Sequence, residues 1–168
     1  ETVFYGNHTG TSAASNAATK AHSARLTTFG PRSSGTMNGS RGFATGGWYN
    51  SWKNNIEYVT IASTGNATAF GNLTVATADY CGGSNAASDR NVVAGGSQGS
   101  TSVYTNTMEY WTGASASNAT DFGDLTNNMR NGGGANNGTG DKAFFTPRTG
   151  SIEQVTPSTP GNATDWGD

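Results

Sequence analysis

The residues best suited to chemistry in this sequence are four aspartates that follow a repeated Asn-Ala-Thr segment: Asp121, Asp124, Asp165 and Asp168. Carboxylate oxygens are ligands that Ca²⁺ prefers in proteins, so these side chains are candidate calcium ligands. Ala69 and Asn72 occupy the corresponding positions of an earlier copy of the segment. A ligand set that changes from copy to copy is more typical of turn capping by Asp and Asn side chains. We therefore expect no cofactor, with calcium as the alternative.

A glutamate recurs at Glu57, Glu109 and Glu153, 52 and 44 residues apart. A carboxylate on a strand can act as a general acid or base, but its repetition in every copy argues against a single active site. The basic residues that recur upstream of the glutamates are Arg41, Arg90 and Lys142. Opposite charges on neighbouring strands stabilise a sheet, so we expect each glutamate to be a buried or cross-strand partner of a basic residue.

Other catalytic arrangements are missing from the sequence. His8 and His22 have no Ser, Cys or carboxylate at a recognisable triad spacing. The glycine runs at 95–96 and 132–134 lack the Gly-Lys-Ser/Thr ending of a phosphate-binding loop. The single cysteine, Cys81, excludes an internal disulfide and a cysteine-only metal site. We therefore expect no enzymatic activity.

Aromatic residues gather just after the pair Gly46-Gly47, where Trp48, Tyr49 and Trp52 occupy an expected loop. Exposed aromatic faces pack against sugar rings and neighbouring amides bond sugar hydroxyls, so these three residues are a candidate glycan- or receptor-binding site. The alternative is packing between sheets, which we favour for Trp48 and leave open for Trp52.

Asn-x-Ser/Thr acceptor sequences occur at one repeated position, at Asn66, Asn118 and Asn162. In a secreted eukaryotic protein these asparagines would be candidate glycosylation sites. The chain is so rich in Asn and Thr that composition alone accounts for many such matches, and we favour that explanation.

Composition narrows the class of protein. The chain has 25 glycines and only 12% charged residues, and its four Trp, six Tyr and seven Phe outnumber Ile, Leu and Val together. Helical bundles and doubly wound α/β folds need more aliphatic residues, so a β-protein with an aromatic core is expected. With only nine Lys and Arg and a net charge of −2, the chain has no basic surface for nucleic acid. No apolar run reaches the roughly 18 residues of a membrane helix, so we expect no membrane insertion.

The sequence repeats itself. The segment Ile56-Glu57-Tyr58-Val59 is echoed at 108–111 and 152–155, and an Asn-Ala-Thr segment follows each copy after ten residues. Short β-branched and aromatic runs between Gly, Asn, Ser and Thr clusters predict strands and turns, with no helix. In the second copy they predict strands over 91–94, 107–112 and 120–126 and a fourth near 78–81, which makes one four-stranded antiparallel sheet. The aromatics that recur with the repeat are expected in the core: Tyr58, Phe70, Tyr110, Phe122 and Trp166.

The order of these features resembles a known family. A basic residue, an apolar run, a glycine pair, a Glu-Tyr strand and a later aromatic resemble the kelch repeat. The amino-acid sequence of 57–68 and 70–74 is similar to that of kelch-like repeat proteins of marine bacteriophages, notably those of cyanobacteria. The resemblance covers most of 41–168. It implies a β-propeller, in which each blade is a four-stranded sheet around an axis. The third copy departs from the pattern, with Thr146-Pro147 in place of the glycine pair.

The expected fold is therefore all-β, with kelch-like repeats of about 45–55 residues whose short antiparallel sheets are arranged as propeller-type blades. We expect a single repeat array over 1–168: a degenerate first module at 1–55, a second at 56–107, a third at 108–151 and closing strands at 152–168. Because closed propellers typically have about four to eight blades, this array is expected to be a piece of a longer propeller or to pair with copies of itself as a homo-oligomer or lattice.

The expected function is that of a non-enzymatic structural protein that self-assembles, a component of a phage virion or of a tail or head fibre with an adhesive role. It would work in a virion or outside the cell, with host-surface glycans or receptors as partners beside the chain itself. The alternatives are a glycan- or receptor-binding β-propeller module and a subunit of an extracellular glycosylated filament.

Overall fold

A computed structural model of the chain describes residues 34–38, 41–85, 90–98, 103–137, 142–146 and 150–168. All regular structure in these ranges is antiparallel β-sheet, as the composition predicts, and none of it is helix. The described ranges consequently hold no helix that could cross a membrane. His8, His22 and the start of the expected first module lie outside the described residues.

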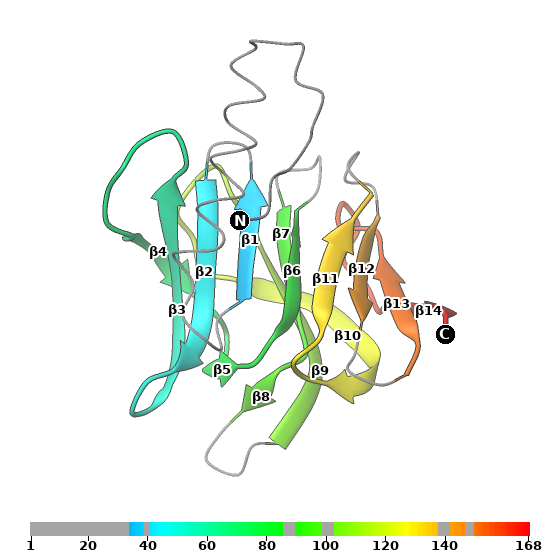
Figure 1. Ribbon diagram of the computed structural model, residues 1–168. Coiled ribbons are helices and arrows are strands. Elements are labelled where there is room, and N and C mark those ends of the chain that lie inside the picture. The colour runs from blue at the N-terminus through cyan, green and yellow to red at the C-terminus, as the bar shows by residue number, and fades with distance from the viewer. Residues whose placement is uncertain (1–33, 39–40, 86–89, 99–102, 138–141, 147–149) are drawn as a thin grey trace, which may run out of the picture.

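Three four-stranded meanders follow one another along the chain (Figure 1). Sheet 1 contains β1 (Ser34–Asn38), β2 (Arg41–Trp48), β3 (Trp52–Thr60) and β4 (Thr68–Asn72). Sheet 2 contains β6 (Cys81–Asn85), β7 (Arg90–Ala94), β9 (Val103–Thr112) and β10 (Thr120–Met129). Sheet 3 contains β11 (Gly133–Asn136), β12 (Ala143–Thr146), β13 (Ile152–Val155) and β14 (Thr164–Gly167). Two short strands, β5 (Thr77–Ala78) and β8 (Ser97–Gln98), extend sheet 2 along the first half of β9.

The strand predictions for the second copy are confirmed at β7, β9 and β10, and the fourth strand lies slightly later than expected, at Cys81–Asn85. Each sheet begins before its glutamate and ends after its Asn-Ala-Thr segment. The limits of the sheets therefore differ from the expected module limits, which begin each copy just before its glutamate.

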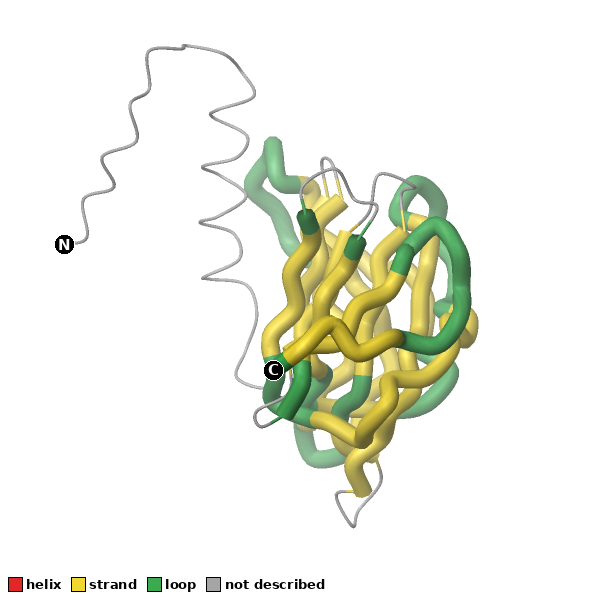
Figure 2. Tube along the Cα trace, turned by 90° about the vertical axis from the view of Figure 1, so that its right-hand side faces the viewer, coloured by secondary structure: helices red, strands yellow, loops and turns green. Residues whose placement is uncertain are grey.

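The first strands of the three sheets are neighbours in space. Strand β6 lies beside both β1 and β11, and the later strands of each sheet extend away from this row (Figure 1). The strands run between the two ends of the molecule, and most of the described turns gather at those ends (Figure 2). Neighbouring sheets therefore face each other.

Each pair of facing sheets has its own core. Between sheets 1 and 2 the core contains Phe43, Ile56 and Phe70 on one side and Val93 and Trp111 on the other. The Phe43 ring makes edge contacts with Phe70 and Trp111, with ring centroids 5.0 and 5.7 Å apart. Aromatic pairs of this kind stabilise by about 0.5–1.5 kcal/mol beyond their buried area. We call the interface between two neighbouring sheets a joint. The aromatic core expected from composition is thus confirmed at the joint between sheets 1 and 2.

The second core, between sheets 2 and 3, is more aliphatic. It contains Val92, Met108 and Phe122 from sheet 2, with Phe145 and Val155 from sheet 3. Successive side chains on a strand point to opposite faces. For this reason Val92 faces sheet 3 while Val93 faces sheet 1, and sheet 2 is buried on both faces.

The glycine pairs have two different structural roles. Gly95 and Gly96 follow the end of β7, as expected, with φ of 67° and 103°. Gly46 and Gly47 also have positive φ but lie inside β2, where the pairing with β3 shifts register. The loop expected directly after Gly46-Gly47 therefore begins later, after Trp48, because a β-bulge accommodates the positive φ without ending the strand.

Candidate functional site

The candidate binding residues lie in the hairpin between β2 and β3. Trp48 pairs with Trp52 across the hairpin, and Asn50 in the turn has a φ of 57°. The Trp48 side chain is 52% exposed and Tyr49 is 74% exposed, while Trp52 is half-buried. Packing between sheets, the interpretation favoured for Trp48, is therefore wrong, because about half of its side-chain surface stays exposed.

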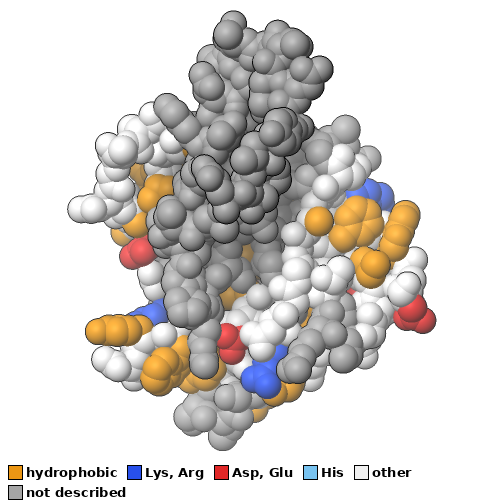
Figure 3. All heavy atoms as spheres, viewed as in Figure 1, with side chains coloured by type: hydrophobic (Ala, Val, Ile, Leu, Met, Phe, Trp, Pro, Cys, Tyr) orange, Lys and Arg blue, Asp and Glu red, His pale blue; other side chains and the backbone are white. Residues whose placement is uncertain are grey.

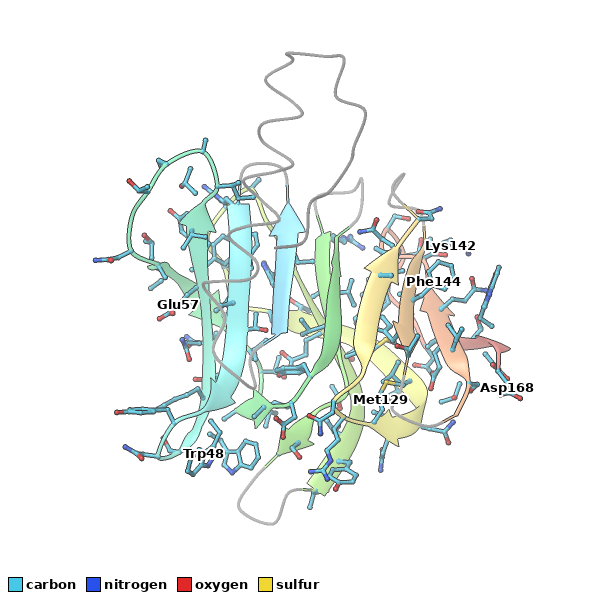
Figure 4. The ribbon with its side chains drawn as sticks, viewed as in Figure 1. Trp48, Glu57, Met129, Lys142, Phe144 and Asp168 are labelled. Atoms are coloured by element: carbon cyan, nitrogen blue, oxygen red, sulfur yellow. The ribbon has the colours of Figure 1, made fainter. Side chains whose placement is uncertain are left out.

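The hairpin carries exposed rings beside polar side chains. In Figure 3, hydrophobic side chains gather at the lower left of the molecule, and Figure 4 places Trp48 there, on the opposite side from Lys142 and Phe144. Lys53 donates a hydrogen bond to the Ser51 hydroxyl, with Nζ and Oγ 2.9 Å apart. Exposed rings beside hydroxyl, amide and ammonium groups can bind the apolar face and the hydroxyls of a sugar.

The recurrent glutamates join neighbouring sheets. Glu109, buried on β9, accepts hydrogen bonds from the backbone N–H and the hydroxyl of Thr74, at 2.8 and 2.9 Å, in the segment that follows β4. Glu153 on β13 accepts a 2.6 Å hydrogen bond from the N–H of Thr126 on β10 in the same way. Each buried carboxylate therefore holds its sheet to the preceding one.

Burial dominates the electrostatics at the first of these carboxylates. Removal from water raises the pKa of Glu109 above its usual value, although the hydrogen bonds from Thr74 oppose the shift, and the charge of Asp121 raises it further. Burial also raises the pKa of the nearby Tyr80 phenol, and the negative charge of Glu109 adds to this effect.

The recurrent arginines bind the next sheet rather than the glutamates. Arg41 Nη1 donates to the carbonyl oxygens of Gly113 and Ala114, at 2.5 and 3.0 Å, and its guanidinium lies 4.7 Å from the centre of the Tyr58 ring. The expected pairing of Arg41 and Arg90 with Glu57 and Glu109 is therefore wrong. The glutamates face the preceding sheet, whereas the arginines reach across the opposite face to the following one.

Arg90 repeats the arrangement one sheet later. Its Nη1 donates to the carbonyl oxygens of Pro157 and Ser158, at 3.1 and 2.9 Å, and its guanidinium lies 4.9 Å from the Tyr110 ring centre. Lys142 in sheet 3 instead donates to the hydroxyl of Thr156, at 3.1 Å, within its own sheet. The expected pairing of Lys142 with Glu153 is not formed.

The Asn-Ala-Thr segments form a third repeated contact between sheets. Asn118 Oδ1 accepts a 3.0 Å hydrogen bond from the N–H of Asn72, and the N–H of Ala119 donates to the Asn72 carbonyl oxygen at 2.8 Å. Asn162 Oδ1 and the N–H of Ala163 make the same two contacts with Asp124, at 3.0 and 2.8 Å. Two of the three candidate glycosylation positions thus use their amide oxygens to join sheets, while the remaining one, Asn66, is exposed.

The four candidate calcium ligands are exposed side chains on β10, on β14 and after β14. Asp165 accepts a 2.9 Å hydrogen bond from the N–H of Gly167, which is the turn-capping role of an aspartate. Within the described ranges, no three His, Cys, Asp or Glu side chains gather into a group that could hold a metal ion.

The core prediction for the recurrent aromatics is confirmed for Phe70 and Phe122, which are 5% and 2% exposed. Tyr58 and Tyr110 are partly buried against the two cores. The prediction is wrong for Trp166, which is 60% exposed. It lies on the outer strand of sheet 3, and no further sheet in the described part of the chain covers it.

Sequence reasoning missed two sets of residues. One is the threonines that bind the recurrent glutamates, and the other is the glycines at which neighbouring sheets meet. Thr74 and Thr126 both follow a recurrent Leu, and Gly71 and Gly123 both follow a recurrent Phe. A Cβ on Gly123 would lie 2.6 Å from the carbonyl carbon of Gly161, and a Cβ on Gly71 would overlap the Ser117 carbonyl. Their recurrence was the available signal, because residues that join equivalent sheets must repeat with the sheets.

No protein-family model matches this sequence. No curated protein is significantly similar to it. The functional argument therefore depends on the geometry of the chain itself.

Proposed function

We propose that this chain is a non-enzymatic structural protein that self-assembles, and that its sheets act as the blades of a kelch-like propeller. The observation that carries the proposal is the repetition of one joint. The contacts made by Glu109, Asn118 and Arg41 between sheets 1 and 2 recur at Glu153, Asn162 and Arg90 between sheets 2 and 3. Repeat units that are stabilised by stacking on identical neighbours are suited to building a larger assembly.

The resemblance to kelch-like phage proteins favours a virion, or a tail or head fibre, as the setting of this assembly. The first test is sedimentation velocity and electron microscopy of the purified chain. Discrete particles larger than 17.2 kDa support self-assembly. A monomer over the whole accessible concentration range contradicts it.

We further propose an adhesive role for the hairpin around Trp48 and Tyr49, whose large exposed rings support binding of host-surface glycans. Binding of the chain to a glycan array should be lost in a Trp48→Ala/Tyr49→Ala variant. The matched control is Val103→Ala, which shortens an exposed hydrophobic side chain on β9. Equal loss in both variants, or unchanged binding in the first, argues against this site.

A further inference from the structure

Sheets 1 and 2 each use one face to hold the next sheet. The corresponding face of sheet 3 is covered by no sheet in the described part of the chain. This leading face of sheet 3 is defined here by Lys142, Phe144, Trp166, Gly167 and Asp168. Trp166 is exposed where the equivalent side chains of sheets 1 and 2 are buried, and its ring makes an edge contact with Phe144, with centroids 5.3 Å apart. A Cβ on Gly167 would meet no atom within 4 Å. In Figure 3 a group of hydrophobic side chains lies beside a basic side chain at the right of the molecule, on the side where Figure 4 labels Lys142 and Phe144.

A hollow adjoins this face. Its volume is about 410 Å³, and its lining includes Lys142, Gln154 and Thr156. At the position of Lys142, sheets 1 and 2 have an arginine, and at the position of Gln154 they have a tyrosine. Each arginine lies over the ring of its tyrosine and donates hydrogen bonds to the turn of the next sheet. The hollow therefore lies where a further turn would bind.

Sheet 1 carries the complementary residues, also uncovered. Its trailing face is defined here by Glu57, Val59, Asn66 and Ala67. Ala67 is exposed, whereas the equivalent alanines of sheets 2 and 3 are buried. Glu57 and Val59 are half-buried, whereas their equivalents are buried. Sheet 1 covers the equivalent face of sheet 2, and sheet 2 covers that of sheet 3. No sheet in the described part of the chain covers this face of sheet 1.

From this match we infer that the leading face of sheet 3 binds the trailing face of sheet 1 in a second copy of the chain. Asn66 Oδ1 accepts a hydrogen bond from the N–H of Asp168, and the N–H of Ala67 donates to the Asp168 carbonyl oxygen. Lys142 reaches the carbonyl oxygens of Ile61 and Ala62. Each contact repeats one that the chain already makes between its own sheets.

The number of copies follows from the number of sheets. Three described sheets in one copy are fewer than the roughly four to eight blades of closed propellers, and nine sheets in three copies are more. Two copies supply six sheets, and two equivalent joints related by a twofold axis close the ring. The inference rests on the proposed function, because it specifies the partner and the surfaces of the proposed self-assembly.

Cross-linking between two different variants tests the contact. In a Cys81→Ala background, the Ala67→Cys chain is mixed with the Asp168→Cys chain and oxidised. A covalent dimer in the mixture is expected. An Asn72→Cys/Ala119→Cys chain should form the corresponding link within one molecule and serves as the positive control. Thr64→Cys mixed with Asp168→Cys should not cross-link, since the residue equivalent to Thr64 stays exposed at the joint between sheets 1 and 2.

The outcomes separate this inference from the proposed function. An Ala67→Cys/Asp168→Cys chain should give a two-copy product as its limit, whereas a ladder of longer products overturns the ring. If the unmodified chain sediments as an oligomer but the mixture does not cross-link, the contact is wrong and self-assembly stands. If the unmodified chain is a monomer at every concentration, both are overturned.

A charge placed in the joint provides an independent measurement. Ala67→Arg should weaken association by about 100-fold or more, because the equivalent alanines are buried and an uncompensated charge there is strongly unfavourable. Thr64→Arg, which places the same charge three residues away in the same turn, should associate like the unmodified chain. Circular dichroism of both variants verifies folding, and equal association of the two overturns the inference.

Discussion

At the scale of single residues, the recurrent charged side chains join neighbouring sheets. Glu109 and Glu153 bind backbone of the preceding sheet, and Arg41 and Arg90 bind backbone of the following one. Backbone N–H and C=O groups at the ends of strands need partners when they approach a neighbouring sheet. The charged residues supply those partners, and hydrogen bonds to charged groups are the stronger kind.

The raised pKa of Glu109 has a consequence for stability. The native state retains the proton to higher pH than the unfolded chain does, so ionisation of this group destabilises the fold as pH rises above about 4.5, its ordinary value. The Glu109→Gln variant lacks this titration. The free energy of unfolding of the unmodified chain, measured relative to the variant by urea denaturation, should therefore decrease as pH is raised from below 4.5 towards neutrality.

A free-energy difference between the unmodified chain and Glu109→Gln that increases with pH would contradict this prediction. It would mean that the hydrogen bonds from Thr74 outweigh the effect of burial on the carboxylate.

At the scale of elements, close approach between a strand and the turn of the next sheet determines where glycine is needed. Gly71 on β4 needs no positive φ, but a Cβ there would overlap the Ser117 carbonyl. Strand and turn meet here through the hydrogen bonds of Asn118 and Ala119 to Asn72. Space, rather than backbone conformation, is therefore the reason for this glycine.

The Gly71→Ala variant should lose about 1–3 kcal/mol of unfolding free energy in urea denaturation, because the added methyl group forces the turn away from β4. Gly65 offers the comparison, since it has ordinary φ and a Cβ there would meet no atom within 4 Å. Gly65→Ala should be neutral or stabilising by a few tenths of a kcal/mol, because alanine restricts the unfolded chain. Similar losses in both variants would indicate that the joint is not closely packed.

At the scale of the whole molecule, the two ends differ from the middle. Sheet 2 is buried on both faces, whereas sheet 3 exposes Trp166 and sheet 1 exposes Ala67. Each end face matches a surface that is covered elsewhere in the same chain. This arrangement favours association through the ends over association through the sides.

Association that stabilises the folded chain should make its melting temperature depend on concentration. Since only the folded state can form the joint, raising the protein concentration shifts the equilibrium away from the unfolded chain. Differential scanning calorimetry should show a rising Tm with concentration for the unmodified chain and for Thr64→Arg. For Ala67→Arg the Tm should be independent of concentration, and a rising Tm in this variant would point to contacts elsewhere on the molecule.

Much of the secondary structure could be predicted from local patterns. The runs over 91–94, 107–112 and 120–126 each lie in a strand, because β-branched and aromatic residues bounded by turn formers favour strands whatever packs on them. The bulge at Gly46-Gly47 could not be separated from a strand end, because both use the same positive φ. Trp48, Tyr49 and Trp52 were expected in one loop, but Trp48 ends β2 and Trp52 begins β3, so only Tyr49 lies in the turn. How far each ring is exposed depends on tertiary packing, which local patterns do not contain.

By itself the sequence determined the all-β class, the repeat, three strands of the second copy and the recurrence of Glu, Arg and Asn, because these follow from composition and local order. Only the tertiary structure decided which face of each sheet is covered and which backbone groups the recurrent side chains bind. Phe70, Phe122 and Trp166 occupy one position of the repeat, yet the first two are buried and the third is exposed. The physical reason is that burial depends on whether another sheet follows, and partners that lie on a neighbouring sheet cannot be identified from the pattern of a single repeat.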